Sequence, residues 1–416
     1  MCNNTIILGA GIAGIGAGYK LGNKATIYEE RNSYGGLCDN FTIEGFRFDY
    51  AVHLSFTQDE TVRSIINQTL YFTHNPISLN YCDGYWVKHP VQNNTFSLPV
   101  EERVNIIKSF INRDINLKVT NYEEWLSSQY GKYFAEKYPG RYTKKYWCLN
   151  AKELSVDWVN NRMYLPSLDE VLYGAMSDST PNTYYAKEMR YPVKGGFKSF
   201  LTPIAENLDI KFEHKATSIE INNKIVTFSN GNKVKYKKII SSLPLPKIIS
   251  MIDDCPIDII NASRNLYASS ICLVSIGFNK KIKIPSLWYY VYDEDILYAR
   301  AYSPSMKSND NVPIGKSSLQ FEIYYSKYKP LYGSEQEIRD KIVKSIVDMK
   351  IANASDIQFV DIRHVEYANV IYYHGMAQDR KIVLNYLNSI GIQNIGRFGK
   401  WDYFWSDQSF MSGYLI

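Results

Sequence analysis

The stretch that decides the fold is Gly9-Ala10-Gly11-Ile12-Ala13-Gly14, which directly follows the apolar run Thr5-Ile6-Ile7-Leu8. An apolar strand that breaks at Gly9 can turn tightly into a helix. Gly11 lets the backbone approach a pyrophosphate, and Gly14 lets the helix lie close to the sheet. The N-terminus of that helix then faces the phosphate charge. The stretch therefore predicts a dinucleotide-binding strand, turn and helix at the start of the chain.

A second apolar strand is predicted at residues 25–28, and it ends in Glu29, twenty residues after Gly9. An acidic side chain at this spacing can accept hydrogen bonds from ribose hydroxyls. A signal peptide or membrane helix is a poor alternative for the apolar residues 5–22. This stretch is rich in glycine, lacks a basic N-terminal region and runs directly into Glu29, Glu30 and Arg31.

Composition limits the class of protein. A chain of 416 residues with 45% hydrophobic residues is expected to form two or three lobes. The net charge of +5 comes without a long Lys/Arg block, which argues against nucleic-acid binding but suits an anionic substrate. Six scattered cysteines without a C-x-x-C pair favour reduced thiols in the cytoplasm, with no disulfide and no metal site expected. No membrane insertion is expected.

The spacing of apolar residues changes three times along the chain, which predicts an α/β multidomain fold. Residues 100–185 show helical apolar spacing, and Asn121 to Glu124 has the form of a capping box. Period-two patterns from residue 210 predict a β-meander with a turn at Asn230-Gly231, and residues 270–370 predict an antiparallel sheet. We expect a discontinuous Rossmann-type domain from residues 1–80, 190–248 and 385–416, a helical domain at 100–185, and an antiparallel sheet substrate domain at 81–99 and 249–384.

Later motifs point to a known family. Glu29, Arg31 and the Gly35-Gly36-Leu37 segment resemble the extended fingerprint of FAD enzymes related to amine oxidases and UDP-galactopyranose mutase. Three further segments resemble UDP-galactopyranose mutase, more its eukaryotic-type and mutase-like branch than the common bacterial one: residues 86–94 (WVKHPVQNN), 191–196 (YPVKGG) and 396–403 (GRFGKWDY). The resemblance runs along nearly the whole chain at low identity, and the first and last segments are its most specific parts.

The resemblance implies a definite chemistry. In this family the N5 atom of reduced FAD attacks the anomeric carbon of a nucleotide sugar, and a sugar–flavin adduct leads from pyranose to furanose. UDP-galactose is the default substrate, and NADH or NADPH is a plausible reductant by the same resemblance. Covalent catalysis by the cofactor leaves the protein to bind, orient and supply charge.

The resemblance also assigns residues. Arg162 and Arg300 match arginines that bind the pyrophosphate, one in a mobile loop and one on the central sheet, and planar guanidinium groups suit oxygen pairs. Expected at the substrate are Tyr403, Tyr290, Trp147, Gln92, His89 and Asn93. Expected at the FAD are His53, Gly396 and Arg397, together with the N-terminal Gly9, Gly11, Gly14, Glu29, Arg31, Gly35, Gly36 and Leu37.

Three positions depart from the family pattern. The loop beside the flavin reads Ala51-Val52-His53 where the family commonly has Gly-Gly-His, and residues with a Cβ atom restrict the backbone. His89 and Val91 stand where the eukaryotic-type family has aromatic residues at the uridine. A tyrosine that contacts the pyrophosphate is expected near Ile371, where only the adjacent Tyr372 or Tyr373 could replace it.

Two alternatives remain open. A true oxidoreductase of the amine oxidase or protoporphyrinogen oxidase type would share the FAD fingerprint but would need an electron acceptor and a largely apolar cavity. A non-catalytic protein that binds flavin or a nucleotide sugar would hold FAD without turnover. The sequence leaves the oligomeric state open, with a homodimer among the options.

Overall fold

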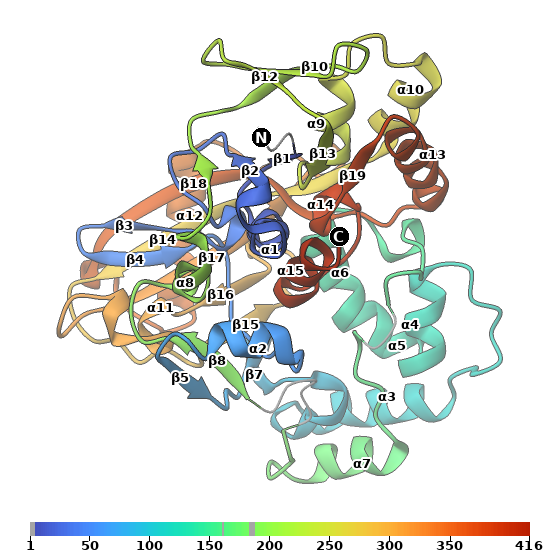
Figure 1. Cartoon of the computed structure of the whole chain (residues 1–416). Coiled ribbons are helices and arrows are strands. Elements are labelled where there is room, and N and C mark those ends of the chain that lie inside the picture. The colour runs from blue at the N-terminus through green and yellow to red at the C-terminus, as the bar shows by residue number, and fades with distance from the viewer. Residues whose placement is uncertain (1–4, 160–161, 183–187) are drawn as a thin grey trace.

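The computed structural model describes residues 5–159, 162–182 and 188–416. A parallel five-stranded sheet in the order β19-β13-β1-β2-β9 organises the upper part of the molecule in Figure 1. Its strands are β1 (Thr5–Leu8), β2 (Ala25–Tyr28), β9 (Ile210–Lys211), β13 (Lys238–Ser241) and β19 (Ile392–Asn394). Segments from the beginning, middle and end of the chain thus form one sheet, and the predicted Rossmann-type fold is confirmed.

Glycines allow two helices to pack closely beside this sheet. Helix α1 (Ile12–Leu21) follows β1, and helix α15 (Ser406–Tyr414) near the C-terminus lies against it. A Cβ atom on Gly16 would lie 2.4 Å from the carbonyl oxygen of Phe410, and one on Gly413 would lie 2.0 Å from that of Ala13. Only glycine therefore permits this backbone separation.

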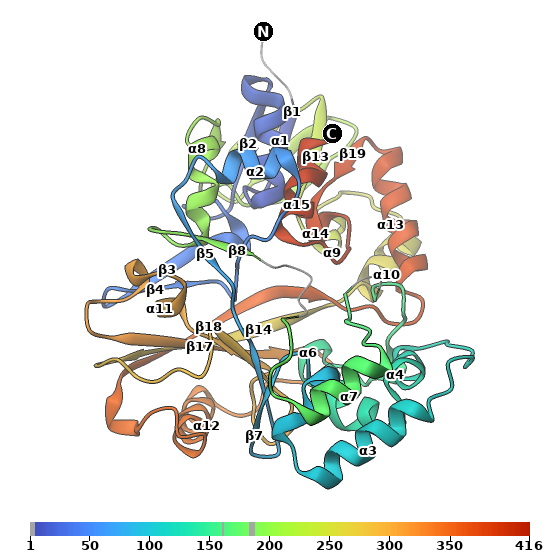
Figure 2. The ribbon, with the colours of Figure 1, turned by 90° about the horizontal axis from the view of Figure 1, so that it is seen from below.

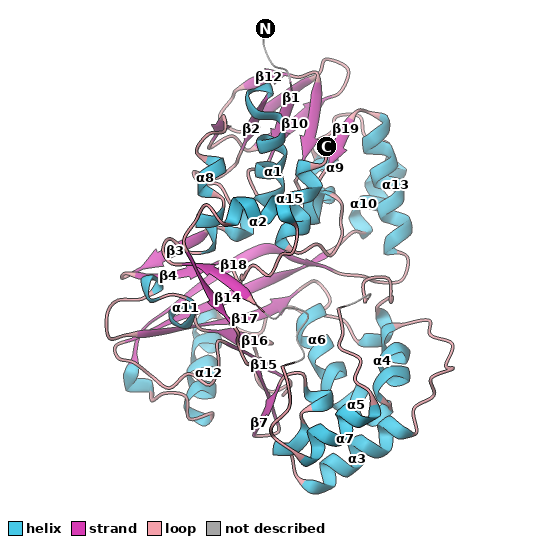
Figure 3. Ribbon diagram, turned by 60° about the horizontal axis from the view of Figure 1, so that its bottom comes forward, coloured by secondary structure: helices cyan, strands magenta, loops and turns pink. Residues whose placement is uncertain are grey.

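A seven-stranded, mostly antiparallel sheet in the order β18-β14-β17-β16-β15-β6-β7 lies below the first sheet (Figure 3). Its strands are β6 (Leu79–Cys82), β7 (Tyr85–Lys88), β14 (Ala268–Phe278), β15 (Trp288–Val291), β16 (Arg300–Tyr302), β17 (Ser317–Tyr325) and β18 (Ile357–Val370). Helix α12 (Glu335–Asp348) covers one face through Ile338, Ile342 and Ile346. This is the antiparallel sheet that the alternation over residues 270–370 predicts.

The helical segment forms a separate group in Figure 2. It comprises α3 (Val100–Ile111), α4 (Tyr122–Tyr130), α5 (Lys132–Ala135), a π-helical turn (Glu136–Gly140), α6 (Arg141–Trp147) and α7 (Leu168–Met176). Asn121 caps α4 by accepting from the backbone N–H of Glu124 at 3.0 Å. The Glu124 carboxylate accepts from the N–H of Thr120 at 2.7 Å and not from that of Asn121. Of the two hydrogen bonds of the expected capping box, the one from the Glu124 N–H to the Asn121 side chain is therefore present.

Smaller elements complete the chain. The predicted meander is present as β10 (Ala216–Glu220), β11 (Ile225–Phe228) and β12 (Lys233–Lys235). Two small antiparallel sheets are the hairpin of β3 (Asn40–Ile43) with β4 (Phe46–Asp49), and the pair of β5 (Tyr71–His74) with β8 (Met189–Pro192), which are distant in sequence. The other helices are α2 (Glu60–Ile66), α8 (Thr202–Ala205), α9 (Leu245–Ser250), α10 (Ile257–Asn265), α11 (Pro304–Lys307), α13 (Met376–Ser389) and α14 (Gly396–Gly399). Short 3₁₀ turns include Gly36–Cys38 and Val91–Asn93.

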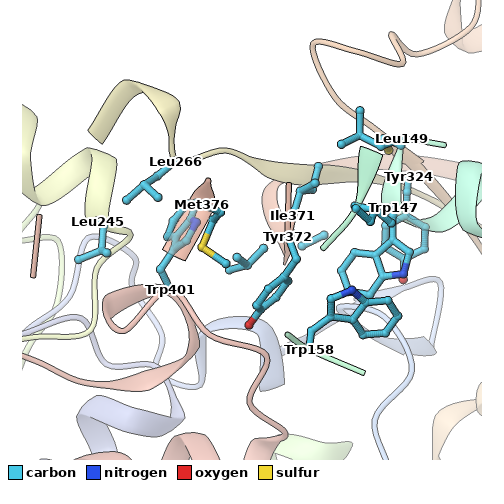
Figure 4. Packing of buried hydrophobic residues seen from close by; sticks show 14 of the residues in the cluster. Trp147, Leu149, Trp158, Leu245, Leu266, Tyr324, Ile371, Tyr372, Met376 and Trp401 are labelled. Carbon is cyan, nitrogen blue, oxygen red and sulfur yellow. The ribbon is translucent and has the colours of Figure 1, made fainter. Parts of the chain in front are cut away.

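The hydrophobic core crosses the boundaries expected between the three parts. The boundary at 80/81 falls within β6, and the one at 384/385 falls within α13, which packs on α10. One buried cluster joins Ile6 of the parallel sheet, Leu126 of the helical segment and Leu273 of the antiparallel sheet. Figure 4 shows part of it, with Trp147 and Trp158 close together. Nowhere among the described residues is there a helix long and apolar enough to cross a membrane.

Candidate active site

A cavity of about 1010 Å³ runs between the two sheets and the helical segment, and most of the predicted site residues line it. These are Gly9, Gly11, Glu29, Arg31, Gly35, Gly36, Leu37, His53, His89, Gln92, Trp147, Arg162, Tyr290, Arg300, Gly396, Arg397 and Tyr403. Gly14 and Asn93 are described but are not part of the lining. Asn160 and Asn161, which precede Arg162 in its motif, lie outside the described residues, as does Cys2.

The glycine-rich turn has the geometry that its sequence predicts. Gly9 has a φ of +94°, and a Cβ atom there would lie 2.4 Å from the hydroxyl of Ser242. A Cβ atom on Gly14 would lie 1.9 Å from the carbonyl oxygen of Gly9, so Gly14 acts by bringing helix and strand together and does not touch the cavity. The N-terminus of α1 therefore opens into the cavity beside Gly11.

Glu29 is held at the end of β2 by two backbone amides. Its Oε2 accepts from the N–H of Ala10 at 2.7 Å, and its Oε1 accepts from the N–H of Arg31 at 3.0 Å. Burial raises the pKa of Glu29, and these hydrogen bonds oppose that shift. Each carboxylate oxygen can accept a further hydrogen bond, as a ribose would require.

The Gly35-Gly36 pair closes the same end of the cavity. The N–H of Gly35 donates to the carbonyl of Ala10 at 2.9 Å, and a Cβ atom on Gly36 would lie 3.0 Å from the Cα atom of Gly11. Gly396, at the start of α14, reaches this end from the other terminus: a Cβ atom there would lie 2.7 Å from that of Ala13. Both terminal regions therefore contribute backbone without side chains to one cradle.

Arg162 is clamped between aromatic rings in the middle of the cavity. Its guanidinium carbon lies 4.4 Å from the ring centroid of Tyr403 and 4.1 Å from that of Trp405. Nη2 donates to the carbonyl of Tyr403, and the buried Nη1 has no partner among the described residues. Burial lowers the pKa of Arg162 from its usual value. A buried N–H without an acceptor is costly, so this geometry favours a ligand oxygen at Nη1.

Arg300 is fixed on β16 by the buried Glu322 of the neighbouring strand β17. Both Nε and Nη2 lie 2.7 Å from Oε2 of Glu322, and Nη2 lies 3.4 Å from the hydroxyl of Tyr324. Burial alone would lower the pKa of Arg300, but the Glu322 carboxylate raises it well above its usual value. The other oxygen of Glu322 accepts from the N–H of Val52 at 3.0 Å. One carboxylate therefore links Arg300 to the loop that carries His53.

Tyr403 stands at the junction of these groups. Its hydroxyl lies 3.3 Å from the hydroxyl of Tyr146, and its ring packs against Trp147 with centroids 5.2 Å apart. Arg397 lies behind it, with its guanidinium carbon 5.4 Å from the ring of Tyr403. Nε of Arg397 donates to the carbonyl of Phe404 at 2.8 Å, and this hydrogen bond fixes the guanidinium against the segment that follows Tyr403.

His53 lies on the loop between β4 and α2 and is neutral at physiological pH. Burial lowers its pKa to about 4, and Nδ1 lies 3.2 Å from the carbonyl oxygen of Ala51. Ala51 itself has a φ of +71°, in the left-handed region that glycine favours. The loop therefore keeps a glycine-like backbone although the sequence has alanine at this position.

The base-side motif lies only partly at the cavity. Val91 is fully buried and is not part of the lining, so it provides no platform for a base. Asn93 is 2% exposed, its Oδ1 accepts from Nδ2 of Asn94 at 3.1 Å, and it is not among the residues that line the cavity. The assignment of Asn93 to the substrate is therefore not supported by its position.

Residues 371–373 do not supply the expected pyrophosphate tyrosine. Ile371 is fully buried, the hydroxyl of Tyr372 donates to Asp402 at 2.7 Å, and that of Tyr373 donates to Asp379 at 2.8 Å. None of the three is among the cavity-lining residues. Residues 371–373 connect β18 to α13, and the hydroxyls of Tyr372 and Tyr373 bind carboxylates in place of a ligand.

Sequence reasoning missed several groups at the site. Glu322, Tyr146 and Trp405 have no local motif, and their roles depend on contacts with distant residues. A second missed feature is the fully buried pair of Lys307 and Asp49, with Nζ 2.5 Å from Oδ2. Asp49 of this pair lies two residues before the loop of residues 51–53. The only available signal was a lysine within an apolar context, which is weak evidence on its own.

The fold and the cavity define a flavoprotein of the dinucleotide-binding type. Residues 7–69 match the model of the NAD(P)-binding Rossmann-like domain. Residues 92–373 match that of the flavin containing amine oxidoreductases, and the chain belongs to this family.

Solved structures share the whole fold at low identity. One is reduced UDP-galactopyranose mutase, with a TM-score of 0.92 and 24% identity over 99% of this chain and 94% of that chain. A CLA-producing fatty acid isomerase from P. acnes has a TM-score of 0.68 and 13% identity over 99% and 97% of the chains. A putrescine oxidase variant has a TM-score of 0.65 and 14% identity over 99% and 97%. The resemblance to UDP-galactopyranose mutase is thus confirmed in the fold.

The residues present fit FAD. The cradle of Gly9, Gly11 and Gly36 leaves space that a Cβ atom would reduce, the N-terminus of α1 suits a pyrophosphate, and Glu29 suits a ribose. The family match and this donor set together identify FAD as the cofactor.

Proposed function

We propose that the protein is an FAD-dependent nucleotide-sugar mutase that interconverts pyranose and furanose forms, with UDP-galactopyranose and UDP-galactofuranose as the default pair. The observation that carries the proposal is the position of two arginines, Arg162 and Arg300, in the cavity that also holds the dinucleotide cradle. A diphosphate leaving group needs cations near it. An amine oxidation needs none at this place.

Each group has a defined task in this proposal. Reduced FAD, when bound, supplies the nucleophile for the anomeric carbon of the sugar. Arg300, which Glu322 orients, and Arg162, which Tyr403 and Trp405 orient, bind the diphosphate and stabilise its charge as it departs. The hydroxyl of Tyr403 donates to the same oxygens. His53 stays neutral, so in this proposal the cations for the diphosphate are the two arginines.

The experiment is anaerobic incubation of dithionite-reduced holoprotein with UDP-galactofuranose and a panel of related nucleotide sugars, read by chromatography. We expect the pyranose to form over many turnovers after a single reduction, because an isomerisation consumes no electrons. The oxidised protein is the control and should be inactive. Turnover that matches the consumption of oxygen or an added acceptor one for one would refute the mutase proposal.

An oxidoreductase of the amine oxidase type is the second candidate, and the aromatic lining favours it. Tyr142, Tyr146, Trp147 and Tyr290 give one end of the cavity a broad apolar surface. The oxidised protein should then be reduced by an amine or another apolar substrate without added dithionite. Bleaching of the flavin absorbance under anaerobic conditions would identify that activity.

A further inference from the structure

Helix α3 of the helical segment carries an apolar stripe on its outer side. Val100 is 65% exposed, Val104 is 41% exposed and Ile111 is 56% exposed. The opposite side of the helix packs inward through Ile106 and Phe110, which are both buried. The stripe is therefore separate from the contacts that hold α3 in the fold.

The stripe has the spacing of a coiled-coil seam. Val100, Val104, the partly exposed Ile107 and Ile111 follow one another at intervals of four, three and four residues. Such intervals keep apolar side chains on one line of a helix, where they interlock with the same line of another helix. Because α3 already has a buried face of its own, this seam suits a helix from outside the chain.

Helix α7 widens the same surface. It packs beside α3 (Figure 3), and the guanidinium of Arg103 on α3 donates to the carbonyl of Ala175 on α7 at 2.6 Å. Leu168, Tyr173 and Met176 of α7 are exposed. Large apolar side chains gathered at the surface in this way mark contacts with other macromolecules. The two helices together therefore present an apolar face that suits a partner protein.

Two charged residues beside the stripe show which partner fits. Glu101 lies in the first turn of α3 and Lys108 in the last, and neither forms an ion pair with a described residue. In an antiparallel pair of α3 helices, with Val104 opposite Ile107 of the second copy, Glu101 of each copy meets Lys108 of the other. A parallel pair would instead bring Arg103 of one copy toward Lys108 of the other, which repel each other.

We propose that α3 and α7 form a self-association surface, on which two copies of the chain pair around a two-fold axis through an antiparallel contact of their α3 helices. A two-fold contact uses the same patch on both copies, and α3 offers itself an apolar seam and two charges of opposite sign. The mixed charge argues against an anionic membrane as the occupant, because that surface attracts lysine and arginine alone. The inference does not depend on the reaction that the protein catalyses.

The test is light scattering coupled to size-exclusion chromatography of the FAD-loaded protein, over a range of concentrations and at low salt. We expect a mass of twice the 48.0 kDa of the chain at the higher concentrations. Val104→Glu should raise the dissociation constant of the dimer at least 10-fold, because it puts a charge into the seam of both copies. Ile314→Glu is the matched control: it changes a fully exposed apolar residue outside α3 and α7 and should leave the dimer intact.

Exchange of the two charges tests the antiparallel register. Glu101→Lys and Lys108→Glu should each weaken the dimer, since each places like charges opposite each other, and the double variant should restore it. High salt should reduce all three effects, because the pairs are exposed. A double variant that is as weak as the single variants would overturn the antiparallel contact.

Two other results would overturn the proposal as a whole. One is a protein that stays monomeric at every concentration, and the other is a dimer that Val104→Glu leaves intact. Vesicles of phosphatidylserine and phosphatidylcholine test the competing occupant: binding that Val104→Glu abolishes, in a protein that is monomeric throughout, would assign the surface to a membrane. Flavin absorbance and thermal unfolding verify that each variant is folded and holds FAD.

Discussion

Replacement of Arg300 by lysine tests the diphosphate site most directly. Arg300 presents two nitrogens to Oε2 of Glu322, both at 2.7 Å, and it lines the cavity at the same time. Lysine has one nitrogen, and the fully buried Glu322 will attract it. Arg300→Lys should therefore keep the buried charge pair, the fold and the bound FAD, but lose the additional guanidinium N–H groups that can face a diphosphate while Nε and Nη2 hold Glu322.

The expected loss can be estimated. Removal of one well-placed donor to transition-state charge typically costs about 3 to 4 kcal/mol, which corresponds to roughly 100-fold or more in turnover. The assay is the initial rate of the anaerobic mutase reaction with reduced enzyme at several substrate concentrations. Since the donor acts most strongly on the leaving group, kcat should fall more than KM rises.

Arg363→Lys is the matched control. Arg363 lies on β18 of the same sheet, pairs with Asp361 at 2.9 Å and is not part of the cavity lining, so its replacement should leave turnover unchanged. Turnover near that of the unmodified protein in Arg300→Lys would refute the diphosphate role of Arg300. Loss of FAD or of thermal stability in this variant would instead show that Arg300 acts through the fold.

Three further results are expected. Gly14→Ala should prevent FAD from binding, measured as flavin absorbance after purification, because its Cβ atom would lie 1.9 Å from a backbone oxygen. Stability should fall as the pH is lowered from about 6.5 to about 4, by up to roughly 1.4 kcal/mol per pH unit for each of His53 and His89. In this window the unfolded chain binds protons that the folded protein excludes, and urea unfolding at each pH tests this. Lys307→Met should lower the free energy of unfolding by about 3 to 5 kcal/mol, because it leaves Asp49 buried without its cation.

Two controls accompany these measurements. Lys344→Met removes a surface partner of Asp348 and should change the free energy of unfolding by less than about 1 kcal/mol. His89→Asn should reduce the pH slope by about half, since one of the two histidines whose pKa falls to about 4 is gone. A pH slope that does not change in this variant would contradict the assignment of the acid sensitivity to His89.

The sequence predicts best those features that are local. The strand, turn and helix at Gly9 to Gly14 need only neighbouring residues, and the alternation at residues 219–228 reports one face of a meander. Both are present in the structure. The extended fingerprint at Glu29 and Gly36 is equally local, which is why the dinucleotide end of the site could be placed in detail.

The parts that could not be predicted depend on long-range pairing. Lys307 and Asp49 are 258 residues apart, and Glu322 joins Val52 across 270 residues. In neither pair do the residues next to one partner in the sequence indicate the other partner. The motif at residues 89–92 likewise shows which residues flank the proline, but only the packing shows that Val91 lies in the core while Gln92 lines the cavity.

The two arginines show how one family fold can serve either redox or isomerisation chemistry. The dinucleotide cradle is built almost entirely from backbone, so it fixes the cofactor without specifying the reaction. The reaction depends on side chains at the opposite end, where Glu322 holds one cation rigidly and two aromatic rings hold another with an unpaired N–H. Glu322 compensates the charge of Arg300, whereas Arg162 has no carboxylate partner among the described residues. That uncompensated cation is the physical argument for the proposed diphosphate substrate, because an amine, itself a cation at neutral pH, would leave it unpaired.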